Sequence, residues 1–228
     1  MKKKLLSALL ALAALLCLSG CAKRETLCTL EDGDRIVTVL GGSGRVNYIS
    51  VSVNGSEIWQ TRVYADRTVG ERDGSYGVRV VDVNFDGRND LIVALTVEGE
   101  VTTEQVFLQQ TDGTYRVSTQ FEKKGNLAVD ARQELVFGFA HSDRTEKDAA
   151  TDRTYHITTD TATAYSWQGS TLVPRKAVSL TYYGGSDLYC YSVAEYDAAL
   201  GAWKDADDVW MSPAEQAAAD LSALYYFR

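Results

Sequence analysis

Oxygen-bearing residues at alternate positions form the clearest candidate site in this sequence. The segment 82–91 reads DVNFDGRNDL. Side-chain oxygens of Asp82, Asn84, Asp86 and Asp90, with the backbone carbonyl of Arg88, can converge on one centre when the chain turns around it. Carboxylate, amide and carbonyl oxygens are the ligands that Ca²⁺ prefers, and the glycine at position 87 permits the sharp bend. The sequence therefore predicts a structural calcium site with these five residues as ligands.

The flanks of this loop predict β-strands rather than helices. Segments 76–81 and 91–97 are rich in β-branched residues, which is typical of strands. An EF-hand would need an apolar residue at its eighth position and a bidentate Glu at its twelfth, where this chain has Asn89 and Val93. The alternative is an acidic hairpin turn whose Asp side chains accept backbone N–H groups without metal.

The loop with its flanking strands resembles the calcium loop of the FG-GAP/VCBS group, which occurs in integrin α-chains and many exported bacterial proteins. A single copy is present, so the resemblance does not extend to a seven-bladed integrin-like head. Position by position, it implies the same five metal ligands.

A narrower likeness spans residues 76–182 and adds the hairpin at 111–115 and the segment 126–130. In these features the chain is similar to small exported bacterial proteins with a lone VCBS-like loop. Some members inhibit lysozyme-type glycosidases as envelope immunity proteins. That role is an implied alternative for this chain, although no motif identifies an inhibitory finger.

The first residues predict export and lipidation. Lys2 to Lys4 precede an apolar run from Leu5 to Leu18, so residues 1–20 are expected to be a signal peptide. About 14 apolar residues are too few for the ~20 that span a bilayer. The ending Leu-Ser-Gly-Cys resembles a bacterial lipobox, which implies a lipid anchor on Cys21 in the cell membrane, followed by a short spacer to residue 30.

The net charge limits the classes of binding partner, and the cysteine content limits the possible disulfides. The formal charge of −8 becomes −11 without residues 1–20, because three Lys and no acids leave (20 − 31). Such a surface disfavours nucleic acid. Outside the cytoplasm Cys28 and Cys190 are expected either to form a disulfide or to remain two thiols.

The rest of the chain predicts one all-β domain over residues 31–228. Turn signals separate short β-rich segments into antiparallel hairpins, forming a sandwich or a propeller-like set of sheets. Pro174 is expected at a sheet edge or a break. Ser212, Pro213 and Glu215 predict the start of one helix over about 213–225, with Ala218 on the face that docks on the sheets. The expected hairpins and strands are 46–53 with 57–64, 105–110 with 114–119, 161–167 with 171–178, and 35–40, 134–140, 153–158 and 187–195.

The histidines, the remaining acidic residues and the aromatic residues give only weak indications of further functional sites. His141 is expected in a polar loop and His156 in a strand, and neither has a zinc-binding spacing. The acids at 205–208 are expected to form a solvated turn. Aromatic residues crowd positions 182–210 and predict either a binding platform or cross-strand packing.

These observations favour a non-enzymatic, calcium-stabilised lipoprotein outside a bacterial membrane. It is expected to bind a protein or a cell-wall glycan. The alternatives are an inhibitor of a lysozyme-type enzyme and, less favoured, a carbohydrate-active enzyme, because two carboxylates suffice for glycoside hydrolysis.

Overall fold

A computed structural model describes residues 24–66, 69, 74–98, 101–122, 124–147 and 149–219. The predicted signal peptide and Cys21 lie outside these residues. The chain divides into two compact units, Met1–Tyr76 and Gly77–Arg228, where the sequence predicted a single domain. Both units are antiparallel β-structure, so the predicted all-β, sandwich-like class is confirmed.

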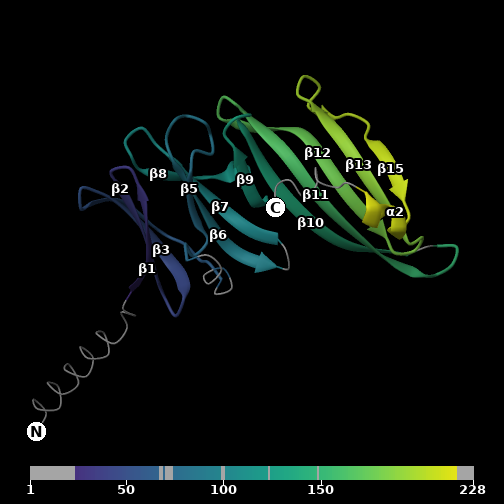
Figure 1. Ribbon diagram of the computed structural model, residues 1–228, viewed down its shortest axis with the longest axis horizontal. Helices are drawn as coiled ribbons and strands as arrows, with labels where there is room; N and C mark the ends of the chain where they lie inside the picture. The colour runs from purple at the N-terminus through teal and green to yellow at the C-terminus, as the bar shows by residue number, and fades with distance from the viewer. Residues whose placement is uncertain are drawn as a thin grey trace, which may run out of the picture. The chain divides into compact units, whose positions relative to one another are not determined.

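The first unit is a four-stranded antiparallel meander in sequence order (Figure 1). Val37 and Val39 in the second strand, and Ile49 and Val51 in the third, are fully buried at alternate positions, as expected for strands that bury one face. The predicted spacer ends earlier than expected, because the chain is already paired in a sheet from residue 25. The strands are β1 (Glu25–Asp32), β2 (Arg35–Gly42), β3 (Arg45–Val53) and β4 (Ser56–Arg62).

The second unit contains an eleven-stranded sheet whose main path runs β14-β13-β12-β11-β10-β9-β7-β6-β5, with β15 paired to β13 and β8 paired to β7. Strands β9 to β13 lie side by side in Figure 1. The bounds are β5 (Val78–Val81), β6 (Asp90–Glu98), β7 (Val101–Gln109), β8 (Tyr115–Ser118), β9 (Gly125–Asp130), β10 (Leu135–Lys147), β11 (Thr154–Gln168), β12 (Thr171–Tyr183), β13 (Leu188–Asp197), β14 (Ala202–Trp203) and β15 (Asp207–Met211).

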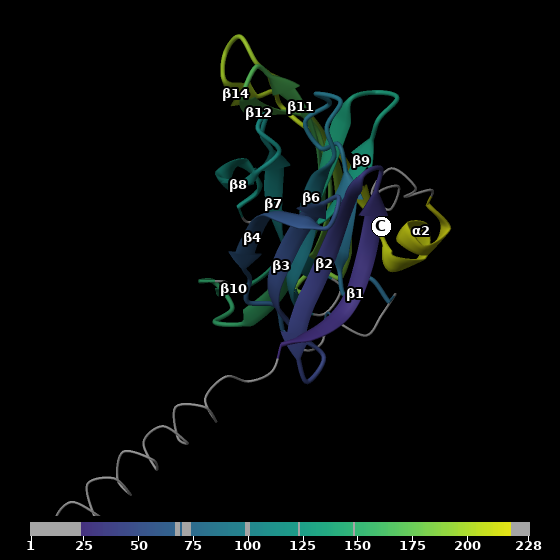
Figure 2. The same cartoon turned by 90° about the vertical axis from the view of Figure 1, so that its left-hand side faces the viewer.

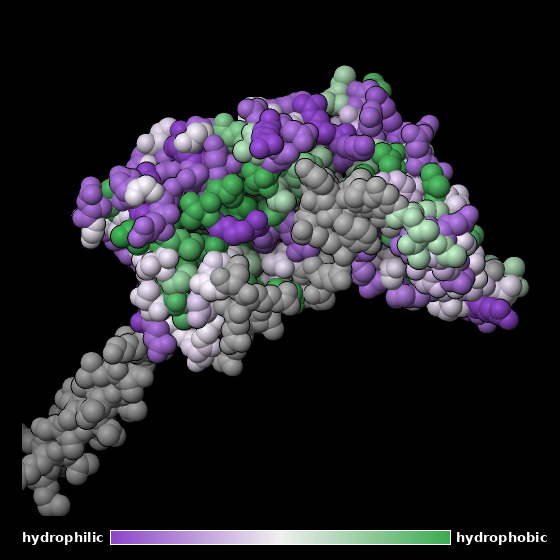
Figure 3. Space-filling view, viewed as in Figure 1, coloured by the Kyte–Doolittle hydropathy of each residue, from purple (hydrophilic) through white to green (hydrophobic). Residues whose placement is uncertain are grey.

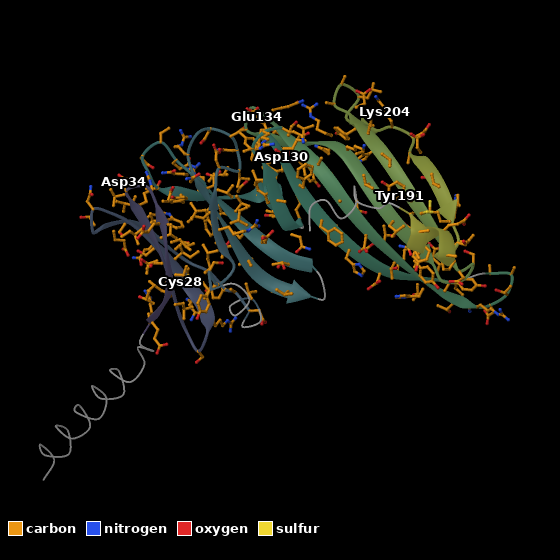
Figure 4. All side chains as sticks on the ribbon, viewed as in Figure 1. Cys28, Asp34, Asp130, Glu134, Tyr191 and Lys204 are labelled. Carbon is orange, nitrogen blue, oxygen red and sulfur yellow. The ribbon has the colours of Figure 1, made fainter. Side chains whose placement is uncertain are left out.

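Two apolar clusters stabilise the second unit. The larger cluster joins the strands around the acidic loop and consists of Val83, Ile92, Val106, Phe121, Leu127, Val136 and Leu172. The smaller one lies on one face of β11 to β15 and consists of Ala162, Val178, Leu180 and Met211, with Tyr189, Tyr191, Val193 and Ala219 packed against it. Tyr191 is labelled on β13 in Figure 4. Burial of these side chains supplies the main favourable free energy of folding.

The predicted hairpins are confirmed, and the largest difference is in length. Residues 153–158 and 161–167 were expected to be two strands, but Thr159 and Asp160 continue the pairing with β10, so β11 is one strand. Pro174 lies where β12 pairs only with β11, because the pairing between β12 and β13 stops at Lys176. Proline has no N–H to donate to a second neighbour, which explains this position.

The helix α2 spans Pro213–Ala218 and begins with the predicted capping box. Glu215 accepts hydrogen bonds from the Ser212 backbone and side chain, which lowers the pKa of its carboxyl. Figure 2 shows α2 beside one face of the sheet. The expectation that Ala218 docks on the sheet is wrong: Ala218 is exposed, and Ala219, just after the helix, packs on the smaller cluster instead. Residues 220–225, the rest of the predicted helix, lie outside the described residues. Within the described part, no helix is both long and apolar enough to cross a bilayer.

Candidate functional site

The acidic loop connects β5 and β6, as the sequence predicted. Val81 pairs with Asp90, so the last residue of one strand lies opposite the first residue of the next and the loop between them closes on itself. Phe85 and Gly87 have positive φ angles, +59° and +82°. Glycine adopts this conformation without steric cost, and the bend expected at position 87 is present.

The loop alternates between the core and its outer surface. Val83 is fully buried in the larger apolar cluster, and Phe85 packs against the same cluster. The side chains of Asp82 and Asn84 are half-buried and Asp86 is exposed. Two apolar anchors therefore hold the loop down, and the three polar side chains between and beside them form its outer part.

Hydrogen bonds gather the polar residues of the loop. The Asp82 carboxylate accepts from the backbone N–H groups of Asp86 (3.1 Å) and Gly87 (2.8 Å). The Asn84 amide donates to Asp86 Oδ2 at 2.9 Å. The Arg88 N–H donates to Asp86 Oδ1 at 3.0 Å, and its guanidinium forms an ion pair with the same carboxylate. The chain thus wraps around residues 82, 84 and 86.

Asp90 is the buried member of the set, with no exposed surface. Its two oxygens accept hydrogen bonds from the backbone N–H groups of Val83 (2.9 Å) and Gln109 (2.7 Å). Burial raises the pKa of Asp90 to about 6, these two hydrogen bonds lower it, and the negative charges of Asp86 and Asp82 raise it further. The three carboxylates therefore act on one another electrostatically.

The donor chemistry of the loop fits a hard divalent cation. All five predicted ligands offer oxygen. Both carboxylate oxygens of Asp90 keep a second lone-pair direction beside the hydrogen bond that each accepts, whereas Oδ2 of Asp86 already accepts from Asn84 and Arg88 and would have to release one of them to bind a cation. A cation would offset the mutual repulsion that raises the Asp90 pKa. In the described residues, however, no three His, Cys, Asp or Glu side chains already surround a common point. Calcium binding therefore stays a prediction.

A side chain on β11 also holds the acidic loop in place. Trp167 donates its indole N–H to the carbonyl of Val83 at 2.8 Å, and its ring meets Phe121 edge-on with centroids 5.8 Å apart. Nothing in the local sequence signals this contact, because the two residues are 84 positions apart.

A second candidate site lies on the sheet face opposite the smaller cluster. Cross-strand register places Tyr183, Trp210, Tyr196 and Trp203 on this face, together with Tyr155. We call these five residues the aromatic face. The Tyr183 and Trp210 rings are 5.1 Å apart and the Tyr196 and Trp203 rings 5.3 Å apart. Both Trp side chains are about half exposed, at 54% and 44%.

Hydroxyl groups line the sheet between the two ends of the aromatic face. Two cross-strand pairs, Thr159 with Thr181 and Thr161 with Ser179, are hydrogen-bonded at 3.1 and 3.0 Å. Ser192 donates to Asp208 at 2.6 Å. The crowded aromatic residues divide between the two faces of the sheet. Tyr182 and Tyr189 pack together at 4.9 Å on the face of the smaller cluster, as expected for cross-strand packing. The two Trp residues lie on the other face, where a binding platform stays a prediction.

One end of the aromatic face is hollowed. A cavity of about 310 Å³ is lined by Glu146, Tyr155, Ile157, Tyr183, Gly185 and Ser186. A Cβ atom on Gly185 would lie 2.5 Å from the Tyr155 ring, so this ring packs directly on the glycine backbone. In Figure 3, hydrophobic residues stand out over the β13–β14 turn and along β15, where Leu200 and Val209 are exposed.

The remaining predicted residues are placed as follows. Cys28 on β1 and Cys190 on β13 are both present as thiols. The sulfur of Cys28 is 3.5 Å from Ser75 O and that of Cys190 is 3.5 Å from Ser192 Oγ. The two residues belong to different units, so the disulfide stays one of the two predicted outcomes. Cys28 is labelled in Figure 4. His141 lies in β10 and not in a loop, because residues 136–147 pair continuously with β11.

Comparisons with known proteins add little to this description. No family model matches the chain, and no curated protein matches it. Among solved structures, the chain is similar to a Xanthomonas protein described as related to a type IV secretion system. The two are 13% identical over 80% of this chain and 92% of that one, with a TM-score of 0.45. A likeness of this strength assigns neither family nor function.

Proposed function

We propose that this chain is a lipid-anchored, non-enzymatic binding module of a bacterial envelope. The lipid on Cys21 tethers it outside the membrane, and the loop 82–90 takes a calcium ion that orders the β5–β6 connection. The aromatic face binds a cell-wall glycan. The observation that carries the binding role is the pair of half-exposed tryptophans, Trp203 and Trp210, on one face of the sheet.

The chemistry of the aromatic face favours a glycan over a protein. Flat aromatic rings offer apolar surface with a polar edge, and the hydroxyl and carboxylate groups between them can exchange hydrogen bonds with sugar hydroxyls. Trp210 pairs with Cys190 and Trp203 with Tyr196, six residues along β13, which is roughly 20 Å in a strand. Such a length suits an extended chain of sugars, and the cavity at Tyr183 suits one unit of it.

Co-sedimentation with insoluble peptidoglycan sacculi tests the binding role. We expect the wild-type protein to pellet with the sacculi and the double variant Trp203→Ala/Trp210→Ala to lose about tenfold or more in affinity, because buried aromatic contacts dominate binding surfaces. Val209→Ala is the matched control, since Val209 is 53% exposed on the same strand as Trp210 but faces the other side. Equal binding by all three proteins would contradict the proposal.

An envelope extract passed over the immobilised protein tests the protein-ligand alternative. Capture of a partner that the double variant fails to capture, without sacculus binding, would replace the glycan by a protein. A lysozyme turnover assay, with and without chelator, then tests inhibition of a glycosidase, and release of reducing ends from peptidoglycan tests catalysis.

Calcium binding is tested by calorimetric titration of the metal-stripped protein. Extracellular calcium modules bind with dissociation constants near 0.1 to 1 mM. About 1 mM Ca²⁺ would then stabilise the fold by roughly 0.4 to 1.4 kcal/mol. This term is too small to create the fold, so the stripped protein is expected to stay folded. The absence of calcium uptake by the folded, stripped protein would overturn the metal part of the proposal.

A further inference from the structure

The two histidines of this chain lie on one face of a pair of neighbouring strands. His141 pairs with Asp160, Asp143 with Thr158, and Thr145 with His156 across β10 and β11. Because alternate residues of a strand share a face, these six side chains lie on the same surface. We call His141, Asp143, His156 and Asp160 the His–Asp cluster.

The carboxylate of Asp143 stands between the two imidazoles. Its Oδ2 is 3.1 Å from Nε2 of His141, and its Oδ1 is 3.6 Å from Nε2 of His156. On the far side of the first imidazole, Asp160 Oδ1 is 2.7 Å from Nδ1 of His141. Both histidines thus direct Nε2 toward the carboxylate of Asp143. The carboxylate of Asp160 forms a hydrogen bond with the opposite nitrogen of the His141 ring, Nδ1.

Each of these separations is close to one edge of a zinc coordination sphere, and each joins an imidazole to a different oxygen of Asp143. With Zn–N and Zn–O bonds of about 2.0 to 2.1 Å, the ligand atoms of a tetrahedral site are roughly 3.3 to 3.4 Å apart. The two separations at Asp143, 3.1 and 3.6 Å, lie on either side of this range. We propose that His141 Nε2, His156 Nε2 and the Asp143 carboxylate bind Zn²⁺, with water as the fourth ligand.

Asp160 has a positioning role in this site. A histidine that binds zinc usually donates its other ring N–H to a carboxylate, which fixes the ring and its tautomer. Asp160 already accepts a hydrogen bond from Nδ1 of His141. The other ring nitrogen, Nε2, faces Asp143 and is the one that would bind the metal.

Zinc binding requires a small rearrangement of exposed side chains. In the described part of the chain, no three such side chains yet enclose a single point, because Asp143 lies between the imidazoles. The side chains of Asp143 and His156 are 51% and 59% exposed, so no packed core opposes their rotation. A divalent ion would also offset the repulsion between the two carboxylates of the cluster.

The His–Asp cluster differs in chemistry from the acidic loop and does not depend on the proposed function. Imidazole nitrogens select zinc and later transition metals, whereas an all-oxygen set suits calcium. Zinc binding at the His–Asp cluster can therefore be measured separately from calcium binding at the acidic loop by adding excess calcium.

The test is a zinc titration of untagged protein at pH 7.5 in about 5 mM CaCl₂, which keeps the acidic loop occupied if it binds calcium. Calorimetry is expected to give one zinc ion per chain. Proton NMR of the wild-type protein is expected to show both imidazole signals shifting together as zinc is added. The NMR readout needs no variant, so it holds even if a substitution disturbs folding.

Substitutions then assign the ligands. His141→Gln, His156→Gln and Asp143→Asn are each expected to weaken zinc binding by more than tenfold, and Asp160→Asn by about 10- to 100-fold through loss of ring orientation. Asp205→Asn, an exposed acid on the β14–β15 connection, is the matched control and is expected to leave the affinity unchanged. Absence of zinc binding by the wild-type protein, imidazole signals that do not move, or equal affinity in the histidine variants would each overturn the proposal.

Discussion

Trp167 on β11 donates its indole N–H to the backbone carbonyl of Val83 in the acidic loop, at 2.8 Å. Val83 is itself fully buried and shares the larger apolar cluster against which the Trp167 ring packs. One side chain therefore fixes the loop both by packing and by a hydrogen bond. A loop held in this way keeps its shape without metal, which reduces the ordering cost of binding an ion.

Trp167→Phe is expected to destabilise the protein. The variant keeps an aromatic ring but leaves the carbonyl of Val83 without this donor, which costs about 1 to 3 kcal/mol. Urea unfolding in the presence of chelator measures the loss. Calcium affinity is expected to fall as well, because the loop becomes less ordered. An unchanged midpoint and unchanged calcium affinity would show that the contact does not support the loop.

Asp90→Asn is expected to weaken the fold even without metal. The Asp90 carboxylate now accepts hydrogen bonds from the backbone N–H groups of Val83 and Gln109. In the Asn variant, the amide nitrogen would face one of these N–H groups and could not accept from it. A buried donor left without an acceptor costs about 1 to 3 kcal/mol. Asp86→Asn is the comparison variant, because the partners of Asp86 are Asn84 and Arg88 on the outer part of the loop, where water can replace the lost contacts. It is expected to lower calcium affinity while changing stability by no more than about 0.5 kcal/mol. Similar unfolding curves for both variants in chelator would contradict this division of roles.

Glu104→Gln is expected to make stability less dependent on pH. The Glu104 carboxylate contacts Arg79 Nη2 and the Leu127 N–H, both at 2.5 Å, and its side chain is 6% exposed. Burial outweighs these partners and raises its pKa above the usual 4.5. The folded state therefore holds the proton more tightly, and this stabilisation, present below pH 4.5, is lost as the pH rises through the raised value.

Denaturant unfolding of both proteins between pH 4 and 7.5 measures this effect. The stability of the wild type minus that of the Gln variant should fall across this window. The variant leaves Arg79 41% exposed and able to contact water. A difference that rises with pH would mean that the ion pair, and not burial, dominates at Glu104.

Gly185→Ala is expected to disturb the cavity on the aromatic face without harming the core. Its Cβ would overlap the Tyr155 ring at 2.5 Å, so the half-buried ring must move. We expect a changed near-UV circular dichroism signal from tyrosine and several-fold weaker binding to sacculi. Gly42→Ala is the control, because its Cβ would meet no atom within 4 Å. A native tyrosine signal would show that Gly185 does not shape the cavity, whatever the ligand proves to be.

Local sequence signals predicted those parts of the structure that short segments decide. Asn54-Gly55 and the glycines at 113 and 169 lie in the turns of the predicted hairpins and have positive φ angles, because turn chemistry acts within a few residues. Strand lengths were harder to predict. The polar run 141–147 reads as a loop, yet β10 continues to Lys147 because β11 satisfies its backbone groups.

Sequence alone determined the spacing of the acidic loop, the strands that flank it, the helix cap at Ser212 and the all-β class, because each depends on neighbours along the chain. Only the tertiary structure placed Trp167 on Val83, brought His141 and His156 to one carboxylate, and divided the aromatic residues between two faces. These relationships depend on strand register, and a shift of one residue would move every side chain of a strand to the opposite face. Register is selected by the packing of the whole sheet, which no short segment encodes.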